Sequence, residues 1–419
     1  MPKWKIYTPE GVQDILFEEC FLKRNLENKL RDIFRSCGYN EVETPTLEFY
    51  DAFSVESDIT PQETMFKFFD QQGRILVLRP DITIPIARIA ATKFRDARYP
   101  LKFSYIGNTF KYNELGGGKQ KEFTQAGVEI LGAGSPEADA EVIATAIQAV
   151  RAMGLESFQI DIGQVEFFKG LMEETGLSEQ EIEQMRVLID QKDFLAVEEL
   201  VKEHKISNNL KELIFSLPGL FGSTDVIDRV EKMTTNKRSL KALENLRQVL
   251  KILDDYELSK YVSVDLGSVQ SLNYYTGIIF RGFTYGVGFP VLSGGRYDRL
   301  IEKFGKNCPA TGFSLGINMI MMALDRQKIT TDKPGVDSIV CYNAGGRKTA
   351  IKICDELRRQ GLVVEMDITG DSLEGIKEYA GSKGIGGILK VLDSENIEVY
   401  NLQTGEVTKT TFSELGAEK

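Results

Sequence analysis

The hydrophobic period changes repeatedly along this chain, and that alternation is the feature that most limits the folds it can adopt. Apolar residues recur at helical spacing over residues 15–37 and again over residues 135–154. Phe158, Ile160 and Ile162 instead alternate with polar residues, as in a half-buried strand. Because helical and strand patterns are interspersed, a fold made only of helices or only of strands is excluded. We therefore predict an α+β architecture.

The pattern also divides the chain into regions. Over about residues 164–258 the sequence is charged and helical, and we interpret it as a helical insertion within a first domain of residues 1–325. A polar linker follows, and residues 335–419 then alternate between strand and helix patterns. This last region predicts a small, separate α/β domain.

Several kinds of site are excluded by the composition. The 419 residues include one histidine, His204, so a Ser-His-Asp triad or a histidine-rich zinc site would have to use that residue. The five cysteines show no CxxC spacing, which predicts free thiols and no metal centre. We find neither a signal segment nor an apolar stretch of membrane-spanning length, and we expect a cytoplasmic protein without a membrane partner.

The charge balance disfavours a nucleic-acid partner. Lys and Arg total 51 against 62 Asp and Glu, which gives a net charge of -11. Nucleic-acid binding usually depends on cations that displace counterions from the phosphates. From residue 335 onward the chain carries 10 basic and 14 acidic residues, a net charge of −4. We therefore expect that the C-terminal domain does not bind tRNA.

Four segments combine glycines, paired aromatic residues and polar side chains in ways that packing alone does not require. They are LRPDITIPIAR (78–88), FSYIGNTFKYNELGGGKQKEFTQAGVEILG (103–132), SLNYYTGIIF (271–280), and GGRYDRLIEKFG with ATGFSLGIN (294–305 and 310–318). Together with GYNEVETPTLEF (38–49), they occur in the order of the class II aminoacyl-tRNA synthetase motifs. On these segments the chain resembles the histidyl-tRNA synthetase family.

This resemblance implies a fold and an assembly. The fold would be a mostly antiparallel sheet flanked by helices, with the helical insertion, followed by a C-terminal domain like the anticodon-binding domain of that family. The segment at 38–49 would lie at the interface of a dimer. The resemblance also implies a histidine pocket, whose residues would be Asp81, Thr83, Gln125, Glu129, Tyr274 and Tyr275.

The implied roles in this pocket are chemically consistent. Asp81, which replaces a glutamate of the family, and Thr83 would accept hydrogen bonds from the α-ammonium group, and Gln125 would face the amino acid. Glu129 and Tyr275 would contact the two nitrogens of the imidazole. Individually these residues are also compatible with surface charges or strand packing. Their joint agreement with one pocket favours the binding role.

The nucleotide half of the implied site departs from the family at several positions, five of which are arginines in the family. In this chain those five are Lys111, Lys119, Lys121, Gln270 and Met319, where the resemblance leads us to expect arginines. Lysine does not replace the planar fork with which arginine binds a phosphate. Since adenylate formation depends on such preorganised cations, we expect that synthetase activity is lost. We also expect that the chain has no catalytic residues and no cofactor.

Within this family the chain is more similar to the regulatory subunits of ATP phosphoribosyltransferase than to the synthetases. The segments TPEGVQDIL (8–16), QAGVEILG (125–132) and LNYYTGIIF (272–280) carry this similarity. It implies a hetero-oligomer with the short-form catalytic subunit, activation of that subunit, and allosteric feedback inhibition by L-histidine in the first step of histidine biosynthesis.

Two other functions remain open from the sequence. One is a divergent but active histidyl-tRNA synthetase, in which the lysines at 111, 119 and 121 would hold the phosphates. The other is a free-standing amino-acid sensor with a different partner. Histidine-dependent exchange of pyrophosphate with ATP distinguishes the first of these from a regulatory subunit.

Overall fold

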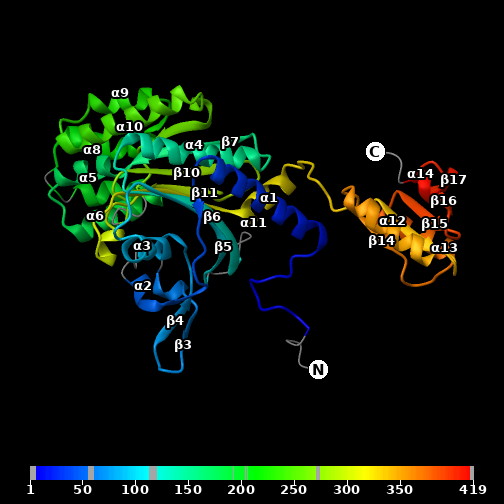
Figure 1. Ribbon diagram of the computed structural model, residues 1–419. Coiled ribbons are helices and arrows are strands. Elements are labelled where there is room, and N and C mark those ends of the chain that lie inside the picture. Colours follow the sequence, from blue (N-terminus) through cyan, green and yellow to red (C-terminus); the bar gives the residue numbers. More distant parts are fainter. Residues whose placement is uncertain are drawn as a thin grey trace. The chain divides into compact units, whose positions relative to one another are not determined.

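The computed structural model describes residues 6–54, 61–112, 120–191, 193–202, 204, 206–269 and 274–415. The chain divides into two compact units, Met1–Thr331 and Asp332–Lys419. Both units contain helices and strands (Figure 1), which confirms the predicted α+β class.

A sheet of nine described strands forms the centre of the first unit, in the order β1-β5-β6-β12-β11-β10-β7-β9-β8. The strands are β1 (Asn40–Glu41), β5 (Leu101–Phe110), β6 (Glu122–Leu131), β7 (Phe158–Gln164), β8 (Phe221–Gly222), β9 (Val262–Asp265), β10 (Ile278–Thr284), β11 (Leu292–Arg296) and β12 (Ala310–Gly316). The central strands from β5 to β7 pair antiparallel, while β1 with β5 and β7 with β9 pair parallel. Successive side chains along each strand therefore point to opposite faces of one sheet.

Three helices cover one face of this sheet: α1 (Phe17–Ser36), α4 (Pro136–Ala152) and α11 (Ile317–Arg326). In Figure 1, α1 and α4 lie along the same side of the strands. Leu26 and Leu30 of α1 and Ile143 and Ile147 of α4 are fully buried with alternate residues of β6 and β12. The predicted helical periods thus correspond to the stripes that bury this core.

Smaller elements lie on the side of the opposite face of the sheet, and some of their residues pack against it. They are α2 (Tyr50–Ser54), α3 (Thr83–Thr92), the short 3-10 helices η2 (Gln62–Thr64) and η5 (Ile301–Phe304), and a three-stranded sheet of β2 (Leu47–Phe49), β4 (Ile75–Leu78) and β3 (Lys67–Phe69). Apolar residues of α3 and η5 form a second core with Phe103 and Tyr105 of β5. This second core adjoins the candidate site.

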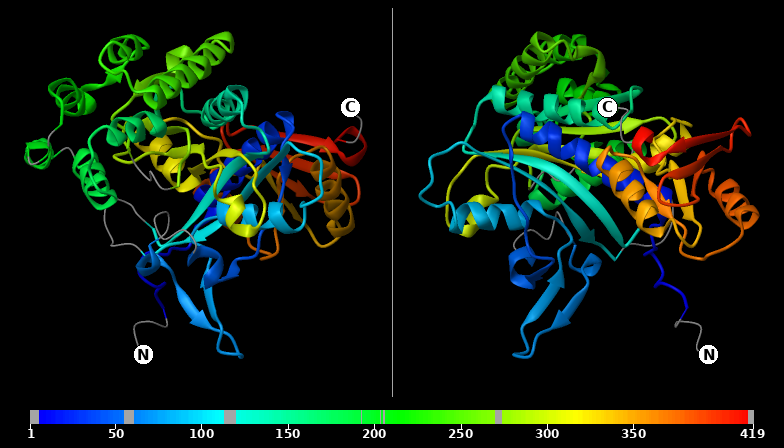
Figure 2. Two further views of the ribbon diagram at one scale, coloured as in Figure 1. Left: turned by 90° about the vertical axis from the view of Figure 1, so that its left-hand side faces the viewer. Right: turned by 45° about the vertical axis from the view of Figure 1, so that its right-hand side comes forward.

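The region predicted as an insertion is mainly helical. Its helices are α5 (Val165–Glu173), α6 (Glu179–Asp190), α7 (Phe194–Lys202), α8 (Asn208–Ser216), α9 (Asp225–Glu231) and α10 (Lys237–Asp255), with the 3-10 helices η3 (Leu217–Gly219) and η4 (Ser259–Tyr261). Figure 2 shows these helices, coloured green, gathered on one side of the unit. Helix α6 begins with a capping box in which Ser178 and Glu181 satisfy each other's backbone amides.

His204 lies in this helical region, where its ring nitrogen Nε2 is 3.1 Å from a carboxylate oxygen of Glu181. It therefore takes no part in the candidate site.

The second unit contains a five-stranded sheet in the order β14-β13-β15-β16-β17. Its strands are β13 (Ser338–Tyr342), β14 (Val364–Met366), β15 (Gly387–Val391), β16 (Asn396–Asn401) and β17 (Val407–Thr411), and its helices are α12 (Arg347–Arg359), α13 (Leu373–Lys383) and α14 (Phe412–Leu415). Strand β13 pairs parallel with β14 and β15, and the remaining pairs are antiparallel. Across the described ranges of both units, no helix has the length and apolar character needed to cross a bilayer.

Candidate functional site

The candidate site lies on the face of the central sheet that is opposite to α1 and α4. Gln125, Gly127 and Glu129 follow one another at every second position of β6, so their side chains share one face. Val128 and Ile130 point to the other face, where they join the core with the long helices. The strand period thus places two polar side chains and a glycine on one surface, beside the beginning of α3.

Glu129 is the most deeply buried acid of this surface, with 1% of its area exposed. Its oxygen Oε1 accepts a hydrogen bond of 2.8 Å from the hydroxyl of Thr83, and the hydroxyl of Tyr297 donates to Oε2. Burial raises the pKa of Glu129 to about 8, although both hydroxyl donors lower it. A carboxylate in this setting is stabilised by a cationic or N–H donor ligand group more than by water.

Two glycines provide the space that this carboxylate and its neighbours occupy. Gly312 is the residue of β12 directly opposite Glu129. A Cβ atom at Gly312 would lie 1.7 Å from Oε2 of Glu129, and one at Gly127 would lie 2.5 Å from the hydroxyl of Tyr105. Glycine is required at both positions because any larger residue would displace the acid or the phenol.

Three tyrosines stand beside Glu129. Tyr274 is stacked on Tyr297 at 5.4 Å between ring centroids and meets Tyr275 edge-on at 4.7 Å. Burial, and then the negative charge of Glu129, raises the pKa of both Tyr275 and Tyr297, so both phenols stay neutral. The aromatic rings and neutral hydroxyls form a wall that suits a flat, polar ring.

Asp81 and Gln125 add hydrogen-bond acceptors to this surface. Oδ1 of Asp81 accepts the amide of Ile84 at 3.0 Å, which also caps the first turn of α3. Burial raises the pKa of Asp81, and the nearby charge of Lys111 opposes this rise. The Oε1 atom of Gln125 is buried and has no hydrogen-bond partner among the described residues. A ligand ammonium group would satisfy acceptors of this kind.

The structure brings five of the six predicted pocket residues into one cluster. Thr83 bonds to Glu129, Asp81 acts on the pKa of both Glu129 and Tyr275, and Tyr274 contacts Tyr275. Gln125 lies on the same face of β6, two pleats from Glu129. The binding roles of all six residues stay predictions.

Sequence reasoning missed Tyr297 and Tyr105 as members of this cluster. Both lie within segments that stood out in the sequence, GGRYDRL and FSYIGNTF. The glycines and aromatic residues that flank them were the available sequence signal. The sequence could not indicate that Tyr297 pairs with Glu129, because 168 positions separate the two residues. Only the strand order β6-β12-β11 brings them together.

The positions that resemble a nucleotide site are occupied by other contacts. The half-buried Met319 packs against the apolar core beneath the sheet. Next to it, Asn318 accepts the amide of Thr124 at 3.0 Å and donates to Gln120 at 2.8 Å, which joins α11 to β6. The ammonium group of Lys121 lies 4.8 Å from the centre of the Tyr112 ring.

Two further predicted positions, Lys119 and Gln270, lie outside the described residues. Within the described part of the chain, no cluster of three or more histidine, cysteine or acidic side chains has the arrangement of a metal site.

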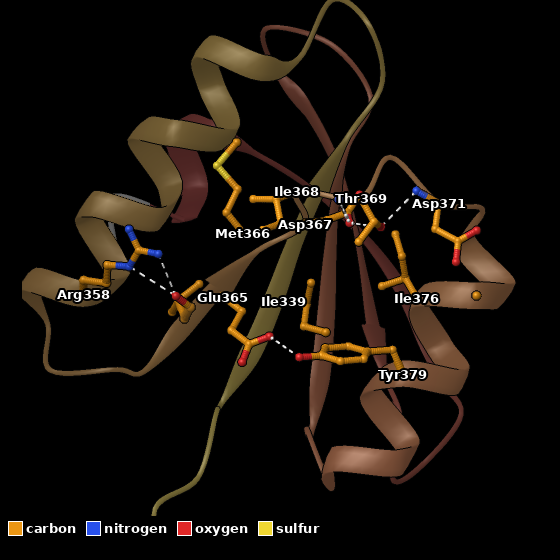
Figure 3. A pocket seen from close by; sticks show the side chains of 12 residues that line it. Ile339, Arg358, Glu365, Met366, Asp367, Ile368, Thr369, Asp371, Ile376 and Tyr379 are labelled. Atoms are coloured by element: carbon orange, nitrogen blue, oxygen red, sulfur yellow. Dashed lines mark hydrogen bonds between the residues drawn. The ribbon is translucent and has the colours of Figure 1, made fainter. Parts of the chain in front are cut away.

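The second unit has a cavity of about 650 Å³ between α12, β14 and α13. Figure 3 shows that Glu365, Asp367 and Asp371 lie around it, together with apolar side chains. Its basic residue, Arg358, donates at 2.8 Å to the backbone oxygen of Val364, and Tyr379 donates to Glu365 at 3.2 Å. A hollow with three carboxylates does not suit a phosphodiester chain.

Comparison with known proteins agrees with the fold. The family model described as histidyl-tRNA synthetase matches residues 11–320. A solved structure described as an ATP phosphoribosyltransferase regulatory subunit/histidyl-tRNA synthetase from Bacillus halodurans is 31% identical, covers 93% of this chain and 99% of its own, and has a TM-score of 0.84. A histidyl-tRNA synthetase from Nostoc is 22% identical with a TM-score of 0.82, covers 98% of both chains, and supports the fold alone.

Curated relatives are more similar in sequence. The ATP phosphoribosyltransferase regulatory subunit of Acetivibrio thermocellus is 74% identical over 415 residues, which cover 99% of each chain. The protein of the same name from Ruminiclostridium cellulolyticum is 56% identical, also over 99% of each chain. This chain therefore belongs to the family of ATP phosphoribosyltransferase regulatory subunits, built on the histidyl-tRNA synthetase fold.

Proposed function

We propose that this chain activates a short-form ATP phosphoribosyltransferase catalytic subunit and transmits feedback inhibition by L-histidine, without catalytic activity of its own. The observation that carries the proposal is the buried cluster of Glu129, Thr83 and Tyr275 on the face of the central sheet. This cluster has the acceptors and neutral phenols that an imidazole and an ammonium group need.

The residues at the nucleotide positions support a binding role over a catalytic one. Met319 offers a thioether in an apolar setting, and Asn318 is engaged with β6 and Gln120. Removing one preorganised donor from a site that stabilises developing charge typically costs about 10²- to 10³-fold in rate. Several such replacements together leave a pocket that binds an amino acid without activating it.

Regulation requires that histidine binds two states of the assembly with different affinities. The hydroxyl of Tyr297, the residue that follows β11, donates a hydrogen bond to Glu129 of β6 and so links two strands that β12 separates. A ligand held at Glu129 therefore acts on strands that are far apart in the sequence. We also propose a dimer through the segment at 38–49.

The test of activation is to mix the purified chain with a short-form catalytic subunit and to measure phosphoribosyl transfer in the absence of histidine. We expect a stable complex on size exclusion and a rate that rises at least tenfold over that of the catalytic subunit alone. A catalytic subunit that gains neither rate nor mass would contradict the proposal.

The alternative of a working synthetase is tested by histidine-dependent exchange of radiolabelled pyrophosphate into ATP. We expect no exchange above a blank without protein, because the cations for the α- and γ-phosphates have been replaced. An authentic histidyl-tRNA synthetase in the same assay serves as the positive control. Robust exchange by this chain would contradict the proposal of a regulatory subunit without synthetase activity.

A further inference from the structure

The cluster around Glu129 offers partners for the ammonium and imidazole groups of a histidine ligand. Its described members include no cation for the ligand's carboxylate. Asp81, Glu129 and the unpartnered oxygen of Gln125 are acceptors, which suit the ammonium and imidazole groups. The ligand's carboxylate needs donors, and a cation provides the strongest ones. Binding of that carboxylate would therefore require a cation with unused donors on the same face of the sheet.

Arg281 of β10 lies on that face. The register runs from Gly127 on β6 to Ser314 on β12, then to Ser293 on β11, and from there to Arg281. Residues directly opposite one another in antiparallel strands share a face, so Arg281 lies on the same surface as Glu129. Three strand spacings of about 4.8 Å place the two strands about 14 Å apart, with the aromatic wall between them.

Tyr275 provides a link between the cluster around Glu129 and Arg281. Burial raises the pKa of Tyr275 most, the charges of Glu129 and Asp81 raise it further, and the charge of Arg281 lowers it. This phenol is thus within electrostatic reach of both groups.

The hydrogen bonding of Arg281 is incomplete. Its Nη2 atom donates to the hydroxyl of Ser268 at 3.2 Å, and its Nε atom is buried without a hydrogen-bond partner among the described residues. The charge of Arg281 acts on Asp161, but within the described ranges no carboxylate forms an ion pair with its guanidinium. A buried guanidinium donor without an acceptor is costly, and a ligand carboxylate would satisfy it.

Two other cations near the cluster, Lys169 and Arg79, already donate to protein groups. Lys169 donates to the backbone oxygen of Tyr275 at 3.1 Å and pairs with Glu166 at 3.2 Å. Arg79 donates to backbone oxygens of Asn108 and Thr44. Lys111 acts on Asp81 at the acidic end of the surface. Arg281 differs from Lys169 and Arg79 because its buried Nε atom has no hydrogen-bond partner among the described residues.

We propose that Arg281 binds the carboxylate of the amino-acid ligand, so that β10 supplies the positive charge absent from position 270. Its contact residue Ser268 lies two positions before Gln270 in the sequence. The proposal rests on the proposed function, because it names a residue of the same histidine pocket.

The test compares two ligands by isothermal titration calorimetry on the full chain. L-Histidinol retains the ammonium and imidazole groups of L-histidine and lacks the carboxylate. For the unsubstituted protein we expect histidine to bind about 10- to 100-fold more tightly than histidinol, which is the usual range for a hydrogen bond to a charged group. Arg281→Gln should weaken histidine binding by that factor and change histidinol binding less than about threefold.

Two further variants sharpen the comparison. Arg281→Lys keeps the charge without the fork and should lose part of the histidine affinity. Arg229→Gln, which removes an exposed arginine of α9, is the matched control and should bind both ligands as the unsubstituted protein does.

The outcomes separate the two proposals. If Arg281→Gln weakens both ligands equally, or weakens neither, Arg281 does not bind the carboxylate and this inference is overturned while the histidine pocket stands. If the unsubstituted protein binds neither ligand, the proposed function fails, and the role of Arg281 fails with it.

Discussion

Glu129→Gln is expected to raise the thermal stability of the free protein and to remove its response to histidine. Burial raises the pKa of this carboxyl from 4.5 to about 8, so the folded state holds the proton more tightly than the unfolded state. The protonated carboxyl makes its full contribution to the free energy of unfolding below about pH 4.5. This contribution is lost as the pH rises through 8. Glutamine stays neutral and avoids that loss.

The stability of the two proteins should therefore diverge with pH. Near pH 5 the variant and the unsubstituted protein should unfold at similar temperatures. By pH 8 the variant should be more stable by about 2–4 kcal/mol, since one unit of pKa shift corresponds to about 1.4 kcal/mol. Thermal unfolding followed by circular dichroism between pH 5 and 8.5, without histidine, measures this difference. A variant that is less stable across the whole range would contradict the assignment of a buried, protonated acid.

Glu129→Gln is expected to lower the affinity for histidine although it raises the stability of the free protein. A carboxylate forms the stronger hydrogen bond to an imidazole N–H, and its charge also favours the ammonium group. We expect histidine affinity to fall about 100-fold, which is within the cost of losing one charge-assisted bond in a buried site. Glu156→Gln, at an exposed carboxylate of the same unit, is the control and should leave both stability and affinity unchanged.

Arg296→Met is expected to cause a large loss of stability in the first unit. The guanidinium of Arg296 lies 2.9 Å from a carboxylate oxygen of Asp139, and the two side chains are 7% and 2% exposed. It also donates to the backbone oxygens of Ala133 and Ser135, so it joins the end of β11 to the start of α4. Removing one member of a buried ion pair leaves the other charge uncompensated and typically costs about 3–5 kcal/mol.

Urea unfolding followed by the fluorescence of the first unit's tyrosines, or by circular dichroism, measures the loss. The double variant Arg296→Met with Asp139→Leu should recover part of the stability, because no buried charge is then left alone. If the single variant is as stable as the unsubstituted protein, the pair does not hold β11 against α4.

The helices and strands with strong periodic patterns were predictable from the sequence. The helical period over residues 15–37 corresponds to α1 (Phe17–Ser36), and the alternation that begins at Phe158 corresponds to β7. The alternating patterns after residue 335 correspond to β13, α12, β14 and α13. Strand β17 (Val407–Thr411) was not predicted, because its largely exposed residues show no apolar alternation.

The arrangement of these elements was not predictable from patterning. The central sheet places β12 beside β6 although about 180 positions separate them, and a hydrophobic period carries no information on that neighbour. The candidate site depends on this arrangement. Thr83 and Glu129 were identified by resemblance, whereas Tyr297 and Arg281 reach the same surface through strand order and register. Pairing between strands that are distant in the sequence is therefore the part of the fold that the sequence patterns could not predict.

The most direct test of the account is a histidine titration of the reconstituted assembly of this chain with a short-form catalytic subunit. With the unsubstituted chain we predict saturable inhibition of phosphoribosyl transfer. With Glu129→Gln we predict an assembly of equal size and equal activity without histidine that stays active at histidine concentrations about 100-fold above the original midpoint. Equal inhibition of both assemblies would show that histidine acts elsewhere and would contradict the pocket on the central sheet as its site.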